Sequence, residues 1–222
     1  MQRYHIKITG TQPLIMHADD VGWSDSMDAW KNNPDNKRGS KAGDDRSPAW
    51  RWLGCLYHDS TNIVMPTNNL MRCLMEAGAL VYVPGGKSGK TFKSQTQSGL
   101  IPTDHGWALH INGDSKPLAA GPIMALKGVS DFEQHEQTAT KMGFSLFVKR
   151  AKIGASKHIR VRPRFERWHT SGLLSCSDEQ ITLEILQQIF TQGGLFKGLG
   201  DWRPGGKTPG PFGTFTAEVK KA

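Results

Sequence analysis

The stretch GGLFKGLGDWRPGGKTPGPFG, residues 193–213, lies between an apolar helical pattern and a final strand pattern near the end of the chain. Eight of its 21 residues are glycine, and Trp202, Arg203 and Lys207 stand among them. Glycine lets a backbone approach another group closely and offer its N–H groups to an anion, so this composition favours a ligand-binding loop before the last strand. We expect the ligand to be a phosphate group.

Positive charge is concentrated in one other segment. The chain has 28 Lys and Arg against 20 Asp and Glu, a net charge of +8. Eight of these basic residues fall at positions 149–167, where Glu166 is the one acidic residue. Solvated surfaces usually mix both signs, so the segment favours a polyanion-binding face over an ordinary charged surface. The residues assigned to this face are Lys149, Arg150, Lys152, Lys157, Arg160, Arg162 and Arg164.

The cysteines and the first residues of the chain bear on its compartment. Cys55, Cys73 and Cys176 are widely spaced and form no Cys-x-x-Cys pair, which argues against a disulfide framework and a zinc ribbon. Cys55 and His58 have a ligand-like spacing, but no second pair accompanies them, so no metal site is expected. Residues 1–7 alternate polar and apolar side chains, unlike a signal peptide or a membrane span. We therefore expect a soluble cytoplasmic protein.

Hydrophobic periodicity predicts both helices and strands. Residues 3–8 alternate as in a half-buried strand, and residues 67–78 and 181–190 place apolar side chains on one helical face. Thr67 and the pair Ser177–Asp178 are the expected helix caps. Further strands are expected at 107–111, 122–126, 144–148, 159–165 and 212–219, with a bulge or break at 170–172.

Two segments between these elements are predicted to be loops. Residues 17–45 are rich in Asp, Asn, Gly, Ser and Lys, as in a long loop of little regular structure. Residues 84–98 form a basic loop in which Pro84 replaces the first glycine that a nucleotide-binding P-loop requires. We expect its lysines to contact phosphates, with a plain surface loop as the alternative. These lysines are Lys87, Lys90 and Lys93.

The order of the elements is strand, long insertion, helix, several strands, helix, glycine-rich loop and strand. This order predicts an α+β fold, a ferredoxin-like or RNA-recognition-motif-like βαββαβ sandwich in which two helices cover one face of an antiparallel sheet. We expect a single domain spanning 1–222, with an insertion at 17–60 and the basic loop at 84–98. The uncovered face of the sheet would be available to a ligand.

Three separated segments carry a family resemblance. They are residues 4–17, a strand running into QPLIMH; residues 65–72, MPTNNLMR, at the start of a helix; and Gly198-Leu199-Gly200 followed by residues 210–213, GPFG. In this order they resemble the RAMP superfamily of CRISPR-associated proteins, especially the repeating backbone subunits that coat guide RNA. The segments are similar to that superfamily's first strand, its entry into helix one and its glycine-rich loop.

The resemblance implies one RNA-recognition-like fold that binds single-stranded nucleic acid, guide RNA foremost, through its backbone. It also implies side-by-side stacking with copies of the chain or with sister subunits. We expect no cofactor. A phage-encoded relative that binds single-stranded DNA or serves in assembly is an alternative. Phe165, Trp168 and Trp202 are expected to supply stacking planes, whereas Phe144 and Phe147 are expected to pack in the core.

Catalysis is the second hypothesis, because some RAMP relatives cleave RNA. The candidates are His17, Asp19 and Asp20 in the loop after the first strand, acting as an acid–base or metal-assisted site. Asp is also an ordinary residue in polar loops, and no second carboxylate cluster or metal-spaced His group accompanies these three. A non-catalytic RNA-binding subunit is therefore the leading hypothesis, and an endoribonuclease is the runner-up.

Overall fold

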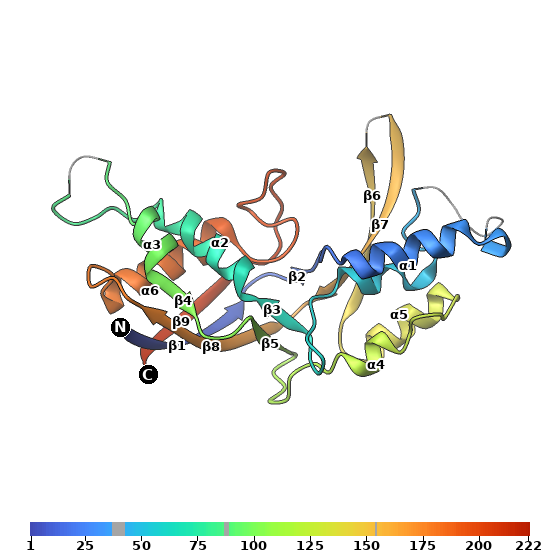
Figure 1. The fold of residues 1–222 in the computed structure, drawn as a ribbon, viewed down its shortest axis with the longest axis horizontal. Coiled ribbons are helices and arrows are strands. Elements are labelled where there is room, and N and C mark those ends of the chain that lie inside the picture. Colours follow the sequence, from blue (N-terminus) through green and yellow to red (C-terminus); the bar gives the residue numbers. More distant parts are fainter. Residues whose placement is uncertain (37–42, 87–88, 154) are drawn as a thin grey trace. The chain divides into compact units, whose positions relative to one another are not determined.

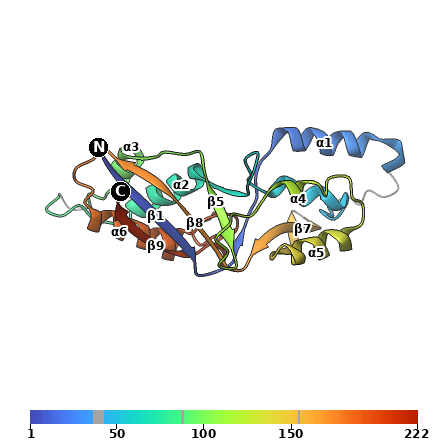
Figure 2. The ribbon, with the colours of Figure 1, turned by 90° about the horizontal axis from the view of Figure 1, so that it is seen from below.

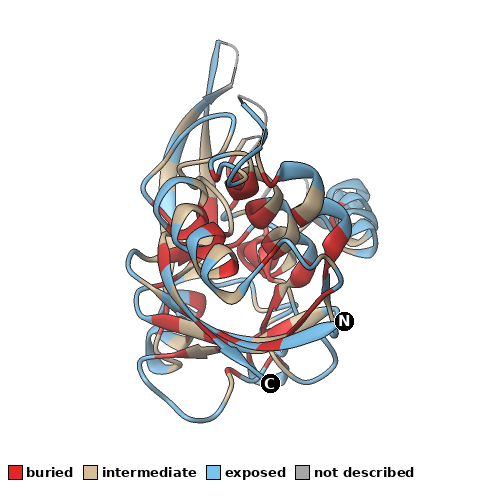
Figure 3. Ribbon diagram, turned by 90° about the vertical axis from the view of Figure 1, so that its left-hand side faces the viewer, coloured by how far each residue is buried: buried red, intermediate tan, exposed pale blue. Residues whose placement is uncertain are grey.

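The strand β1 (Gln2–Gly10) lies inside an antiparallel sheet because its side chains alternate between apolar and polar. Tyr4, Ile6 and Ile8 are buried, while the residues between them are exposed. One face of the strand therefore packs against the core and the other faces outward, and its exposed positions are visible near the N-terminus in Figure 3. β1 pairs with β8 (Trp168–Cys176) on one side and β9 (Phe215–Lys221) on the other, both antiparallel.

The computed structural model describes residues 1–222 except 37–42, 87–88 and 154, so Lys87 lies outside the described residues. The chain separates into two compact units. Unit 1 comprises Met1–Leu14, Val64–Leu118 and Glu166–Ala222, and unit 2 comprises Ile15–Ile63 and Ala119–Phe165. The segment predicted as an insertion, residues 17–60, lies in unit 2 together with residues 119–165.

Unit 1 is an antiparallel sheet with helices. The strand order is β3 (Val64–Pro66), β5 (Gly106–Ile111), β8, β1 and β9, and β4 (Leu100–Pro102) pairs with β8. Its helices are α2 (Thr67–Gly78), α3 (Lys93–Gly99), α6 (Leu183–Gln192) and the π-helical turn η3 (Gly193–Lys197). Leu70, Leu74 and Ala77 of α2 and Leu186 and Phe190 of α6 are buried, which places an apolar face of each helix in the core. Figure 1 labels the strands and α-helices of this unit, and Figure 2 shows most of them from below.

Unit 2 combines short helices with a long hairpin. Its helices are α1 (Val21–Asn32), α4 (Gly121–Met124) and α5 (Phe132–Lys141), and its 3-10 turns are η1 (Pro34–Asn36) and η2 (Ala49–Cys55). The hairpin strands are β6 (Ser145–Ile153) and β7 (Ser156–Phe165), in a sheet of order β2-β7-β6, where β2 is Leu14–Ile15 at the boundary between the units. Trp52, Phe144 and Phe165 pack together, with ring centroids 6.0 and 5.3 Å apart.

The mixed α+β class, the antiparallel strands and several individual elements are confirmed. The helix predicted at 67–78 is α2, and the predicted face of Leu70, Cys73, Leu74 and Ala77 is buried. The predicted strands at 107–111, 144–148 and 159–165 correspond to β5, β6 and β7, and the predicted last strand and second helix correspond to β9 and α6. The helix caps differ: Pro66 precedes α2, and Thr182, not Ser177–Asp178, caps α6.

Two local predictions were wrong. Residues 122–126 are not a strand, because Pro122 lies in the first turn of α4, where proline's fixed φ suits a helix start. β8 runs through 170–172 without a break. A Cβ at Gly172 would lie 2.1 Å from the Trp107 indole, so this glycine makes room for a neighbouring side chain rather than bending the strand.

The predicted loop at 17–45 contains a helix. Trp23, Met27 and Trp30 recur at the three- and four-residue spacing of a helical face, and Asp20 caps α1 by accepting a hydrogen bond from the Trp23 N–H. Two other helices were missed in polar sequence. One is α5, capped by Asp131, and the other is α3, which overlaps the end of the predicted basic loop 84–98.

One face of the unit 1 sheet carries a pair of stacked histidines. His110 of β5 lies opposite His169 of β8, and the two imidazoles stack with centroids 4.6 Å apart. Partial burial lowers the pKa of His169, and the neighbouring His110 and Lys7 lower it further. The folded chain therefore holds His169 in its neutral form more strongly than the unfolded chain does.

Acidification should destabilise the fold through His169. Because the pKa is lowered on folding, the unfolded chain takes up this proton first as the pH falls below the ordinary histidine value of about 6.5. The free energy of unfolding of the wild type should thus decrease, relative to that of His169→Asn, between pH 7.5 and pH 5.5. Urea titrations of both proteins measure this difference. A difference that stays constant over the pH range would refute the assignment.

Candidate nucleic-acid interface

The basic residues predicted to form one track lie on a two-stranded ladder with two faces. β6 and β7 pair antiparallel from Ser145↔Arg164 to Ile153↔Ser156 (Figure 1). Paired residues share a face, and successive residues alternate between faces. One face, called here the arginine face, carries Lys149, Arg160, Arg162 and Arg164 together with Phe147 and Ser145. Arg150, Lys152 and Lys157 lie on the opposite face, so the single track expected from the sequence is split.

Apolar side chains hold β7 against the core of unit 2. Val161 and Phe165 are fully buried and alternate with the arginines of the arginine face. Arg164 donates through Nε to the Ser145 Oγ, 3.1 Å away, and its guanidinium lies 5.7 Å from the centroid of the Phe147 ring. The expected stacking planes Phe165 and Trp168 are buried, so neither offers a ring face to a base; this prediction was wrong. Phe144 is buried as expected, whereas Phe147 is only partly so.

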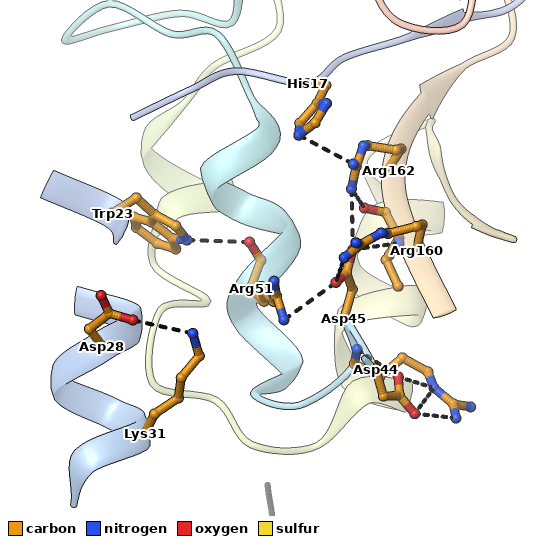
Figure 4. A network of polar contacts seen from close by, with 11 residues as sticks. His17, Trp23, Asp28, Lys31, Asp44, Asp45, Arg51, Arg160 and Arg162 are labelled. Carbon is orange, nitrogen blue, oxygen red and sulfur yellow. Dashed lines mark hydrogen bonds and ion pairs between the residues drawn. The ribbon is translucent and has the colours of Figure 1, made fainter. Parts of the chain in front are cut away.

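Asp45 is the centre of a charge cluster beside β7. Backbone hydrogen bonds align the segment at 43–45 with β7: Ile159 N–H donates to the Gly43 carbonyl and Asp45 N–H donates to the Ile159 carbonyl. The Asp45 side chain is only 5% exposed. Its carboxylate accepts from Arg160 at 2.9 Å, from Arg162 at 3.3 Å and lies 3.4 Å from the Arg51 guanidinium. We call these four residues the Asp45 cluster (Figure 4).

A pocket of about 580 Å³ opens beside the Asp45 cluster, within unit 2. Its wall includes the three arginines of the cluster, the start of α1 and the three catalytic candidates of the sequence analysis. The fold thus brings the basic strand residues Arg160 and Arg162 to the same hollow as His17, Asp19 and Asp20. The sequence analysis treated these two sets as rival sites.

The three catalytic candidates have different surroundings. His17 is exposed, and its Nε2 lies 3.2 Å from an Arg162 Nη, which makes Nε2 the acceptor. Asp20 is already used as the N-cap of α1. Asp19 is exposed. Across the described residues, no group of three His, Cys, Asp or Glu side chains is arranged to hold a metal ion.

Several glycines of the 193–213 loop are explained by contacts of the chain with itself. A Cβ at Gly213 would lie 1.8 Å from the Leu199 carbonyl oxygen, and one at Gly194 would lie 2.0 Å from that of Phe215. Gly213 also has a φ of +71°, a left-handed conformation that other residues rarely adopt. These glycines let the loop pack tightly against β9 and itself, a requirement that the sequence analysis assigned to a ligand.

The remaining residues predicted to bind nucleic acid, in this loop and at 84–98, occupy either structural or exposed positions. Arg203 donates to Glu76 of α2 at 3.1 Å and to the Lys197 carbonyl at 3.0 Å. Burial raises the pKa of Glu76, but hydrogen bonds from Arg72 and Arg203 more than offset this, so its pKa is lowered and the carboxylate stays charged. Trp202 packs against Phe212, and its indole N–H donates to the Pro209 carbonyl. Lys207, Lys90 and Lys93 are exposed.

The sequence analysis missed Asp45 and Arg51. Asp45 lies in a polar stretch with no periodicity and is more than a hundred residues from Arg160 and Arg162 in the chain. Arg51 stands between two tryptophans in an apolar segment, where the sequence carries no signal of a binding site. Nothing in the local sequence distinguishes Asp45 from Asp44, whose carboxylate instead forms a two-pronged contact with Arg46. The pairing is visible only once 43–45 is aligned with β7.

Comparisons with known proteins add no family. Neither the models of known protein families nor the curated proteins include a match to this sequence. Within the described part of the chain, no helix combines the length and the apolar composition needed to cross a bilayer. The case for a function therefore rests on the fold and on the geometry of the arginine face and its pocket.

Replacing Gly213 by Ala should destabilise unit 1. The new methyl group would collide with the Leu199 backbone, and alanine would have to adopt the left-handed conformation of residue 213. Together these effects should lower the free energy of unfolding by at least about 2 kcal/mol. Gly206→Ala is the matched control, since its nearest neighbour in the same loop is 3.1 Å away, and its effect should stay below about 1 kcal/mol. Urea denaturation measures both. Equal effects would show that the loop tolerates a side chain at 213.

Proposed function

We propose that this protein binds single-stranded nucleic acid through phosphate contacts, as a RAMP-type subunit of a ribonucleoprotein complex. The observation that carries the proposal is the arginine face of β6–β7, where Lys149, Arg160, Arg162 and Arg164 follow one another on one side of a ladder. Regularly spaced cations favour an extended chain of phosphates over a compact anion. Guide RNA is the proposed ligand, and single-stranded DNA is the alternative for a phage-encoded relative.

We propose a ferredoxin-like topology for unit 1. Its strand order β5-β8-β1-β9, with α2 between β1 and β5 in the chain and α6 between β8 and β9, matches the βαββαβ order. All three pairings are antiparallel, as that topology requires. This arrangement supports the RAMP resemblance, because that superfamily was expected to share the fold.

Assembly with copies of the chain or with sister subunits is part of the same proposal. Leu195 and Phe196, just before the glycine-rich loop, are 58% and 55% exposed. Adjacent exposed apolar side chains favour contact with another protein surface. We place the protein in the cytoplasm, because Cys55, Cys73 and Cys176 are buried and none of them forms a disulfide. Burial raises the pKa of the Cys73 thiol to about 12, so this thiol stays reduced and unreactive there.

RNA cleavage is a second candidate function, favoured by the position of His17 beside Arg162. When the Arg162 guanidinium turns from Nε2 to the attacked phosphate, Nε2 is able to accept a proton from a ribose 2′-hydroxyl while the arginine stabilises charge on that phosphate. His17→Asn should then abolish cleavage of a single-stranded RNA without weakening its binding. Unchanged RNA after prolonged incubation with the wild type would exclude this second function and leave the binding proposal intact.

Salt dependence tests the binding proposal. With about four phosphate contacts on a single strand, the affinity should fall roughly 50-fold between 50 and 200 mM salt. Fluorescence anisotropy with labelled 30-nucleotide RNA and DNA of several sequences measures this, and base sequence should change the affinity little. Absence of binding to every strand, or binding insensitive to salt, would contradict the proposal.

Two lysines on the same strand distinguish the faces of the ladder. Lys149 lies on the arginine face, and Lys152 lies on the opposite one. Lys149→Gln should weaken binding at least about tenfold, because it removes a charge-assisted contact, and Lys152→Gln is the matched control with little effect. The same anisotropy titration compares them. Equal losses would show that the strand does not follow the arginine face.

A further inference from the structure

We propose that the pocket beside the Asp45 cluster binds the terminal phosphate of the strand that lies on the arginine face. This inference rests on the proposed function and names one part of its ligand, a phosphomonoester. Arg160 and Arg162 belong both to the arginine face and to the pocket wall. A strand following the face is therefore led to the pocket.

The Asp45 cluster holds more positive charge than its buried carboxylate requires. A carboxylate that is 5% exposed needs a cationic partner, and one guanidinium is enough to neutralise it. Three guanidiniums meet Asp45, so these four residues together carry a net charge of +2. Holding three cations together repels each from the others, and an anion in the pocket would relieve that repulsion.

The arginines keep donors for such an anion. Asp45 uses one Nη atom of Arg51 and one of Arg160, whereas each guanidinium has five N–H groups. Their side chains are 32% and 29% exposed, so both reach the open pocket. Figure 4 shows Arg51 approaching Asp45 from η2 and Arg160 from β7. Two guanidiniums fixed from different elements form a preorganised fork for phosphate oxygens.

Acidic residues on the remaining wall restrict where the anion can lie. Asp28 is paired with Lys31 at 3.2 Å, and Asp20 is engaged in capping α1. Asp19 is exposed to solvent. These carboxylates repel a phosphate from the α1 side of the pocket, which leaves the arginine wall as its binding surface.

The charge of the cluster matches the end of a strand better than its middle. An internal phosphodiester carries one negative charge, whereas a terminal phosphomonoester carries about 1.5 to 2 at neutral pH. Two surplus positive charges therefore complement the terminal group. A volume of about 580 Å³ is also sufficient for one phosphorylated nucleotide.

Strands that differ only at their ends test the inference. We would measure the affinity of the purified wild type for one 12-nucleotide RNA with a 5′-phosphate, a 3′-phosphate or hydroxyls at both ends, and for adenosine monophosphate against adenosine. One phosphorylated end should bind at least about tenfold tighter than the hydroxyl strand. Equal affinity of all three strands would overturn the inference while leaving the proposed function standing.

Two arginine variants make the test specific to the pocket. Arg51→Gln removes one pocket cation but leaves Asp45 paired with Arg160 and Arg162, so the fold should persist, as thermal melting would verify. It should reduce the preference for the phosphorylated end to less than about threefold. Arg46→Gln is the control, since Arg46 is paired with Asp44 outside this pocket and the preference should stay as in the wild type. An equal reduction in both variants would contradict the inference.

The mononucleotide arm separates the two ways in which binding could fail. If no strand binds at all, the proposed function is wrong. The pocket would then be judged by adenosine monophosphate alone, which should bind the wild type at least about tenfold tighter than adenosine and lose that advantage in Arg51→Gln. Equal binding of nucleotide and nucleoside would refute the phosphate site as well.

Discussion

The buried carboxylate of Asp45 is the interaction on which unit 2 depends. Backbone hydrogen bonds align the segment at 43–45 with β7, and the Asp45 carboxylate then contacts guanidiniums from both η2 and β7. Removing it would leave three arginines facing one another without the carboxylate that they share, a costly arrangement where the site is shielded from water. The same surplus of charge that the carboxylate only partly neutralises makes the site suited to a phosphate. Structural and binding roles are therefore properties of a single cluster.

The sequence predicted the elements whose side chains alternate regularly, because burial of one face imposes that pattern. The strand at 3–8 and the helix at 67–78 follow from such periodicity. It also located the concentration of basic residues at 149–164, but it could not assign them to faces. The face of each residue depends on the β6–β7 register and on where the turn falls. Lys149 and Lys152 therefore lie on opposite faces of the ladder, although the sequence counts both as members of one basic segment.

Glycine content was a weaker guide than charge. A glycine is required wherever a Cβ would collide, whether the obstacle is a ligand or the chain itself, and sequence composition does not separate these cases. Gly194 and Gly213 face carbonyl oxygens of Phe215 and Leu199, so packing explains them. Arg203 similarly ties the loop to Glu76. The helix at 21–32 was missed because its Asp- and Ser-rich face resembles a loop. Its apolar stripe is short, with Met27 buried and Trp23 and Trp30 half-buried.

The most direct test of nucleic-acid binding is to purify the protein without nuclease, irradiate it with ultraviolet light and identify the cross-linked peptides by mass spectrometry. Binding along the arginine face predicts a co-purifying single strand with cross-links concentrated in peptides from 145–165 and from the neighbouring wall at 17–23. Preparations free of nucleic acid, or cross-links confined to unit 1, would contradict the assignment of the strand to this face.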